Sequence, residues 1–310
     1  MNRPPDPRAA AASGGATATL RVEHLTESRY HQRVAVAEHI AHLHPLEDAT
    51  QSVLQHELLI EPAPSHRHED RDAMGNWRQT FSIDTAHDVL LVRARSLVRV
   101  REPAIPPDPR KSLPWERVAQ ALRYVAGRPY EPECEFAFAS PFVPLDARLR
   151  QYALESFPPD RPVHVGAIDL MHRIHADFRY DTASTEVSTP LLEAFEARAG
   201  VCQDFAHAMI GCLRSLGLAA RYVSGYLRTK PPGGADALVG ADASHAWVSA
   251  WCPEQGWIEL DPTNDVIPAL LHVRLARGRD YGDVAPLRGV VHGGGEHELR
   301  VAVRVEAAGG

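Results

Sequence analysis

The sequence has no long apolar run and no excess of positive charge. A membrane-spanning helix needs about 20 consecutive apolar residues, and no run in this chain approaches that length, so a soluble protein is expected. Lysine and arginine number 33 against 40 acidic residues, which gives a formal net charge of −7. Because nucleic acids and anionic membranes bind basic surfaces, neither is expected as a partner.

Cysteine is scarce, and the four cysteines lie far apart in the sequence. Cys134, Cys202, Cys212 and Cys252 form no C-x-x-C pair, which argues against both a zinc knuckle and a disulfide framework. A secretory signal is also missing, because residues 1–19 are rich in Pro, Ala and Gly and have no apolar centre. We expect these residues to form a disordered leader and the protein to stay in the cytoplasm.

The chain is long enough for one large domain or two modest ones, with 310 residues of which 44% are hydrophobic. From residue 20 to 101, short runs rich in β-branched residues alternate with polar breaks, as in Val89–Val92 and Ser96–Val100. This pattern predicts an antiparallel β-sandwich over 20–101. The segment 102–114 contains Pro-Pro-Asp-Pro and is typical of a linker.

Longer helical patterns follow the linker and predict an α+β domain over residues 115–290. One helix is expected over Leu191–Ala199, with Thr189 as its N-cap and Pro190 at its first position. Residues 291–310 begin with three glycines and predict a C-terminal strand and tail.

A further helix is expected to begin close to Cys202 and to end at Gly217. Its apolar residues recur at helical spacing and predict one face turned to the core: Phe205, Met209, Cys212, Leu213 and Leu216. A thiol at a helix N-terminus meets unsatisfied N–H groups and the positive end of the dipole, which favour the thiolate. The same N–H groups can hold a developing oxyanion. His207, Cys212 and Cys252 are expected to pack, and Cys134 has no base motif near it.

Two strands downstream supply a histidine and a carboxylate. Ser244–Trp251 and Trp257–Asn264 predict an antiparallel hairpin. Because strand side chains alternate between faces, a two-residue turn at Glu254-Gln255 would put His245 and Asp261 on opposite faces. We therefore predict an odd-numbered loop or a bulge, which allows the two side chains to meet.

Three blocks together resemble the core of the bacterial transglutaminase-like superfamily. They are Gly200–His207, Ser244–Val248 and Asp261–Asn264. The resemblance extends over most of the chain from about residue 20. Val22–Thr26 with Gly75-Asn76 is similar to the N-terminal β-domain of the family, and Gly278–Val284 with Leu287–Gly289 is similar to its C-terminal signature. It implies a papain-like α+β core behind the β-sandwich.

The resemblance also implies a chemistry. Cys202 would be the nucleophile, His245 the base that takes its proton, and Asp261 the carboxylate that orients the imidazole. The thiolate would attack an amide of a peptide or protein substrate and form a thioester, without metal or organic cofactor. A primary amine acceptor would give transfer or ligation, and water would give deamidation or proteolysis. A ligase-like pathway partner is implied as well.

Three further residues are candidates near this site. Animal members carry an upstream tryptophan that donates to the oxyanion, whereas the stretch from Pro158 to Cys202 contains none. Tyr180 is the candidate substitute, because a phenol also donates a hydrogen bond. Trp247 and Asp204 are candidates for a substrate groove, with core packing and helix-dipole stabilisation as their respective alternatives.

Other interpretations of the sequence are a peptidase or deamidase on the same scaffold, a binding module that has lost its chemistry, and a zinc enzyme. An intact Cys-His-Asp set argues against the binding module. A histidine group in the first 70 residues invites a metal interpretation, but no Glu or Cys completes a familiar ligand spacing: His39, His42, His44, His66 and His68.

Overall fold

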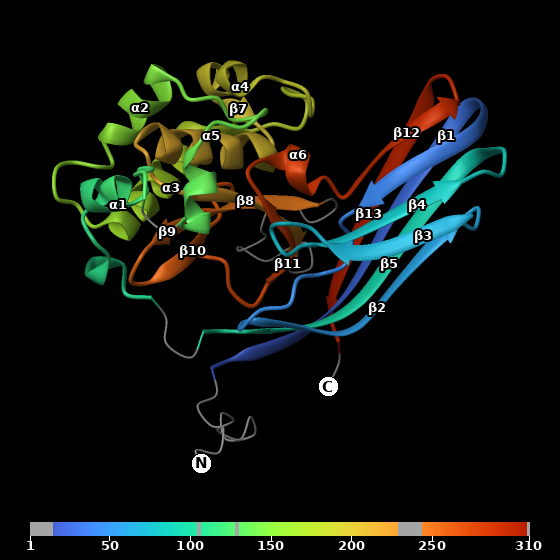
Figure 1. Cartoon of the computed structure of the whole chain (residues 1–310), viewed down its shortest axis with the longest axis horizontal. Coiled ribbons are helices and arrows are strands. Elements are labelled where there is room, and N and C mark those ends of the chain that lie inside the picture. Colours follow the sequence, from blue (N-terminus) through green and yellow to red (C-terminus); the bar gives the residue numbers. More distant parts are fainter. Residues whose placement is uncertain (1–14, 104–106, 128–129, 229–243, 309–310) are drawn as a thin grey trace, which may run out of the picture.

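The computed structural model describes residues 15–103, 107–127, 130–228 and 244–308. Helices gather on one side of the molecule and long strands on the other (Figure 1). Most of the predicted leader lies outside the described residues, but Thr17–Thr19, which were assigned to it, already belong to the first strand. None of the helices within the described ranges has the length and apolar character needed to cross a membrane.

The N-terminal part is a seven-stranded antiparallel sheet arranged around one long strand, β1 (Thr17–Ala41). The first half of β1 pairs with β5 (His87–Arg101) on one side and β13 (His297–Ala307) on the other. Its second half pairs with β4 (Trp77–Ile83) and β12 (Leu287–Gly293). The register shifts between Arg29 and Val34, where the strand passes from one half to the other.

Each half is completed by one more strand, β2 (Gln51–Glu61) next to β5 and β3 (His66–Arg71) next to β4. Apolar side chains from both halves form one shared core cluster, which includes Val34 of β1, Ile60 of β2, Phe81 of β4 and Val92 of β5. The antiparallel strands and their shared core confirm the predicted antiparallel β region.

The boundaries of this part differ from those predicted. Short runs separated by polar breaks were expected here, but residues 17–41 form the single long strand β1. β3 was not predicted, because its sequence His-Arg-His-Glu-Asp-Arg has no apolar alternation. β12 begins at Leu287, inside the range assigned to the core, and it pairs with β1. These strands can be assigned only from their pairing in the sheet, and that pairing joins residues far apart in the sequence.

The second part is the α+β core, so the predicted fold class is confirmed. Its main sheet is antiparallel, in the order β10 (Gly256–Leu260), β9 (His245–Cys252), β8 (Ala220–Leu227) and β11 (His272–Gly278). A small parallel pair joins β6 (Arg179–Tyr180) to β7 (Ala199–Gly200). The helices are α1 (Trp115–Ala121), α2 (Ala147–Leu154), α3 (Val163–Asp177), α4 (Leu191–Ala197), α5 (Cys202–Ser215) and α6 (Tyr281–Val284).

Two local predictions in the core need correction. Helix α4 begins at Leu191 with Pro190 as its N-cap residue, and Thr189 instead accepts a hydrogen bond from the Glu186 N–H at 2.9 Å. The linker 102–114 contains a short 3₁₀ helix, η1 (Pro109–Lys111), and residues 104–106 of it lie outside the described residues. A second 3₁₀ helix, η2 (Pro132–Ala137), follows α1.

Helix α5 is the centre of the core. Every residue from Gln203 to Arg214 is buried, as expected of a helix that other elements cover on all sides. It packs on β8 and β9 and is surrounded by α2, α3 and α4. The N-terminus of α5 is therefore held rigidly beside β9, and both elements carry predicted site residues.

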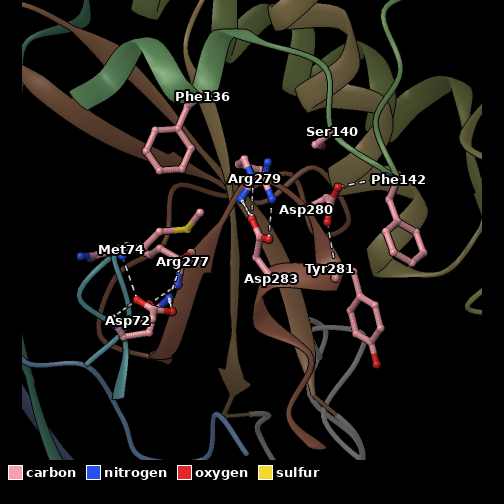
Figure 2. A network of polar contacts seen from close by, with 12 residues as sticks. Asp72, Met74, Phe136, Ser140, Phe142, Arg277, Arg279, Asp280, Tyr281 and Asp283 are labelled. Atoms are coloured by element: carbon pink, nitrogen blue, oxygen red, sulfur yellow. Dashed lines mark hydrogen bonds and ion pairs between the residues drawn. The ribbon is translucent and has the colours of Figure 1, made fainter. Parts of the chain in front are cut away.

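The two parts are joined by buried side chains. Asn76 is 0% exposed and its amide bonds both backbone groups of Arg277 on β11, at 2.8 Å each. Gln51 does the same for Arg274, with 2.8 Å to the carbonyl and 2.8 Å from the N–H. Asp72 receives a hydrogen bond from Asn76 at 2.8 Å, close to Arg277 (Figure 2). The Gly75-Asn76 turn is thus a connector between the parts.

Candidate active site

Cys202 is the first residue of α5, and Asp204 fixes the backbone around it. The Asp204 carboxylate accepts the Val201 N–H at 2.8 Å and the Thr185 hydroxyl at 2.7 Å. Gly200 has no room for a side chain, since a Cβ there would lie 2.4 Å from Asp204 Oδ2. At the start of a helix, the N–H groups of Cys202 and Gln203 have no intrahelical acceptor, so they can face a developing oxyanion.

Asp204 does not line a groove. It is 3% exposed, and burial raises the pKa of its carboxyl group. The substrate-groove role proposed for Asp204 is therefore corrected to a structural one: it caps the helix that presents Cys202.

The hairpin register brings His245 and Asp261 together. Cys252 faces Gly256, so the loop consists of the three residues Pro253–Gln255 and has the predicted odd length. Nε2 of His245 lies 2.8 Å from Oδ2 of Asp261, and both side chains are fully buried. The parity argument from the sequence is confirmed.

Asp261 is the most heavily bonded carboxylate of the site. Its Oδ1 accepts the N–H groups of Thr263 at 3.0 Å and Asn264 at 3.2 Å. Its Oδ2 accepts from His245 at 2.8 Å, from the Asn264 amide at 2.9 Å, and from His272 Nε2 at 3.2 Å. Burial alone would raise the pKa of Asp261, but these partners, with His245 foremost, hold it well below its usual range.

His245 stands between this carboxylate and the thiol. Burial lowers the pKa of His245, but the charge and hydrogen bond of Asp261 outweigh burial and, with a smaller contribution from Cys202, raise it. Its second nitrogen, Nδ1, is buried and has no hydrogen-bond partner among the described residues. The Cys202 thiol is close enough to His245 to affect the pKa of its imidazole. Cys202 Sγ also lies 4.0 Å from the Ser244 carbonyl.

Trp247 does not line a groove either. It is 0% exposed, its Nε1 donates to Glu259 Oε2 at 3.0 Å, and its ring packs against His245 and His272 with centroid separations of 6.0 and 5.3 Å. The groove role is corrected: alternation along β9 turns this side chain into the core, where it supports both histidines.

His272 is a site residue that the sequence did not reveal. It begins β11, is 2% exposed, and shares Asp261 Oδ2 with His245. No local sequence pattern could assign His272 to the site, because β11 and β10 lie at opposite edges of the sheet.

Tyr180 lies near the nucleophile. It pairs with Gly200 in the β6–β7 ladder, two residues before Cys202, and is half-buried. Burial raises its pKa, with a smaller effect from Cys202. Tyr222 of β8 is a second tyrosine near the thiol: burial, then Cys202, raises its pKa well above the usual value. The sequence analysis did not single out Tyr222.

The residues expected to pack do so. His207 is buried, its Nε2 accepts the Tyr281 N–H at 3.2 Å, and burial lowers its pKa to about 3, so it cannot replace His245 as a base. Cys212 and Cys252 are fully buried, and Cys134 is half-buried.

One group of metal-ligating residues converges in the described part of the chain. It consists of His245, Asp261 and His272, whose ligand atoms lie within 4.8 Å of one another. Both Nε2 atoms already point at one Asp261 oxygen as hydrogen-bond donors, so the cluster is complete as a hydrogen-bonded triad. The N-terminal histidines form no such group: His39 stacks on Phe81 at 5.1 Å, and His44 lies against His56 and Trp77.

The Gly278–Val284 segment contacts α5 through a network of polar side chains, and Figure 2 shows its Arg279, Asp280 and Asp283. Asp280 caps α6 by accepting the Gly282 N–H at 2.9 Å and reaches the Phe142 N–H at 3.0 Å. Arg279 pairs with Asp283 at 2.9 Å, and its carbonyl accepts from the buried Arg214 of α5 at 2.6 Å. The segment thus supports the helix that carries Cys202.

Two family models match the chain. The transglutaminase-like superfamily core matches residues 159–262, and the bacterial transglutaminase-like N-terminal region matches residues 20–99. A structure of a candidate cysteine protease from Cytophaga hutchinsonii has a TM-score of 0.72 at 21% identity, covering 95% of this chain and 92% of that one. At this identity the likeness concerns the fold.

Relatives in sequence cover nearly the whole chain. An uncharacterized protein of Mycobacterium tuberculosis is 41% identical over 287 residues, 91% of this chain and 90% of its own. Another from Mycobacterium leprae is 30% identical over 292 residues, 92% and 98% of the two chains. A protein-glutamine gamma-glutamyltransferase of Pseudomonas aeruginosa is 42% identical over 98 residues, 30% of this chain and 15% of its own. The chain therefore belongs to the bacterial transglutaminase-like family, with both the N-terminal region and the transglutaminase core.

Proposed function

We propose that this protein is a cysteine-dependent acyltransferase or hydrolase that acts on amide bonds of a peptide or protein substrate. The observation that carries the proposal is the position of Cys202 at a helix N-terminus together with the buried pair of His245 and Asp261, whose Nε2 and Oδ2 atoms lie 2.8 Å apart. The family core implies cysteine-dependent acyl transfer or hydrolysis in general.

In this reaction the Cys202 proton passes to His245 Nδ1, and the thiolate attacks the amide carbonyl carbon. The tetrahedral intermediate places its oxyanion near the Cys202 N–H, with the Tyr180 hydroxyl as the proposed second donor. His245 then gives its proton to the leaving nitrogen, the C–N bond breaks, and a thioester remains on Cys202. Asp261 keeps the imidazole oriented and stabilises its charged form. These steps need no metal or organic cofactor.

The thioester is resolved by a second nucleophile. A primary amine gives a new amide, and water gives an acid. We propose acyl transfer to an amine because of the name of the Pseudomonas relative, and hydrolysis because of the description of the Cytophaga structure. Cytoplasmic location and a ligase-like partner remain proposals. A binding module without chemistry would have no use for a complete buried Asp261–His245 pair.

The test is mass spectrometry of the wild type and of Cys202→Ala with a library of glutamine-containing peptides and a primary amine. A mass change of about one unit means deamidation, amine adducts mean transfer, and cleavage means peptidase activity. Cys202→Ala is expected to abolish all three, whereas the matched variant Cys134→Ala keeps the activity. In addition, iodoacetamide at pH 6 to 7 is expected to modify Cys202 faster than Cys212 or Cys252. Equal rates would contradict an activated thiol.

A further inference from the structure

The loop of residues 181–189, which leads from β6 to α4, is fastened to the first turn of α5. Three hydrogen bonds join this loop to residues at most two positions from Cys202: the Asp181 N–H donates to the Gly200 carbonyl at 2.9 Å, the Thr185 hydroxyl to the Asp204 carboxylate at 2.7 Å, and Gln203 Nε2 to the Val187 carbonyl at 3.1 Å. The 181–189 loop is therefore held beside the nucleophile.

The end of the loop is also closed on itself. The Glu186 N–H donates to the Thr189 hydroxyl oxygen at 2.9 Å, and the Thr189 N–H donates to the Glu186 carbonyl at 3.0 Å. These two bonds enclose Val187 and Ser188 in a tight turn. The backbone of Val187 is thus fixed by the turn on both sides and by Gln203 at its own carbonyl.

The 181–189 loop is polar except for one large side chain. Its sequence is Asp-Thr-Ala-Ser-Thr-Glu-Val-Ser-Thr, so Val187 is its only apolar residue larger than alanine. Val187 is 55% exposed. Single exposed apolar residues are common on protein surfaces, so the significance of Val187 lies in its attachment to the turn that presents Cys202.

The hydrogen bond from Gln203 limits how far Val187 can lie from the nucleophile. Consecutive Cα atoms are about 3.8 Å apart, and a glutamine side chain adds four bonds of about 1.5 Å at most. Together with the 3.1 Å hydrogen bond, this places the Val187 carbonyl within roughly 13 Å of the Cys202 Cα atom. An extended peptide covers that distance in about four residues.

The acyl donor must approach Cys202 from the solvent side. Residues 203–214 of α5 and 245–250 of β9 are buried, whereas Cys202 itself is half-buried. The 181–189 loop is exposed over most of its length. It is therefore an element of the surface over which a bound peptide has to pass.

We propose that Val187 is a specificity-determining residue, which packs against an apolar side chain of the acyl donor within about four positions of the amide that Cys202 attacks. Gln203 is the positioning residue, because its amide holds the Val187 carbonyl. The substrate class is then a peptide with an aliphatic or aromatic residue close to the reactive amide. This inference rests on the proposed function, because it assigns the substrate class of the same thiol.

The test uses iodoacetylated tetrapeptide amides that share one warhead. Each leucine probe carries leucine at one of the four positions and glycine at the others, and a matched probe carries asparagine, a polar side chain of similar size, at the same position. Rates of Cys202 modification are measured by site-resolved mass spectrometry on the full chain. In the wild type, the leucine probe is expected to react about threefold to tenfold faster than its asparagine counterpart at one position or more, as for partial burial of one apolar side chain.

Two variants and one control follow this ratio. Val187→Asn should bring it close to one, whereas Val187→Ile should keep it. The control is Val290→Asn, which makes the same change at a 77% exposed position on β12 and should leave the ratio unaltered.

Equal rates for leucine and asparagine at all four positions of the wild type would overturn the inference. A leucine preference that Val187→Asn does not alter, while Cys202 still reacts, would overturn it as well. If Cys202 reacts with none of the probes faster than Cys134, the proposed function itself fails, and the role of Val187 fails with it.

Discussion

Among the single residues of the site, Asp261 is the one to which His245, His272 and Asn264 are hydrogen-bonded. A buried carboxylate without partners would cost several kcal/mol, and this one is matched by five donor contacts. Two of them come from loop N–H groups, which fix the carboxylate plane. The others come from side chains, so the charge that His245 meets is shared with His272 and Asn264.

His272 is expected to act as a positioning residue. His272→Leu removes one donor to a charged oxygen, a contact worth about 1.5 to 3 kcal/mol, so kcat should fall roughly tenfold to a hundredfold with KM unchanged. His272→Gln keeps an N–H donor and should recover most of that loss. Steady-state kinetics on a substrate identified by the peptide library measures both variants.

His164→Leu serves as the control for this prediction. His164 is a fully buried histidine on α3 whose two ring nitrogens have no partner in the described ranges. Its loss should change stability and leave kcat intact. Equal kcat values for His272→Leu and wild type would show that Asp261 needs no third side chain.

Among the elements, α5 carries the site, and its first turn depends on Asp204. Burial raises the pKa of Asp204, so the folded chain keeps this proton at pH values where the unfolded chain has lost it. The resulting stabilisation is complete below the ordinary carboxyl pKa of about 4 and disappears as pH rises through the raised value. Relative to Asp204→Asn, the wild type should therefore lose unfolding free energy as pH rises from 4 to 7.

Urea denaturation at a series of pH values measures this difference. Glu193→Gln, at an exposed position on the neighbouring helix α4, should run parallel to the wild type. A wild-type curve parallel to that of Asp204→Asn would mean that Asp204 does not titrate differently in the folded state.

Sequence patterns predicted those features that arise within one element or one hairpin. The N-terminal cysteine of α5 and the shared face of His245 and Asp261 follow from helical spacing and strand parity, which are local. Trp247 and Asp204 were placed in a groove because sequence does not distinguish a side chain near the thiol from one buried beneath it. His272 and the pairing of β12 with β1 depend on contacts between distant segments, which leave no local periodicity.

For the whole molecule, the joint between sheet and core depends on Asn76. Asn76→Ala leaves the N–H and the carbonyl of Arg277 without their partner in a buried interface. Unsatisfied buried groups cost about 1 to 3 kcal/mol each, so the unfolding free energy should fall by roughly 2 to 5 kcal/mol. Chemical denaturation gives this value, and Gln55→Ala, at an exposed position on β2, should change it little. A neutral Asn76→Ala would mean that the two parts are held together elsewhere.

The position of β13 against β1 also has a consequence for how the protein is made. β1 leaves the ribosome early, yet two of its four neighbours, β12 and β13, are translated after the entire core. Until then β1 carries bare backbone groups along one edge, a template for unwanted pairing with other nascent chains. The N-terminal sheet therefore closes after synthesis of the core. A prematurely terminated polypeptide would retain the triad but would leave that edge of β1 without its partner strands.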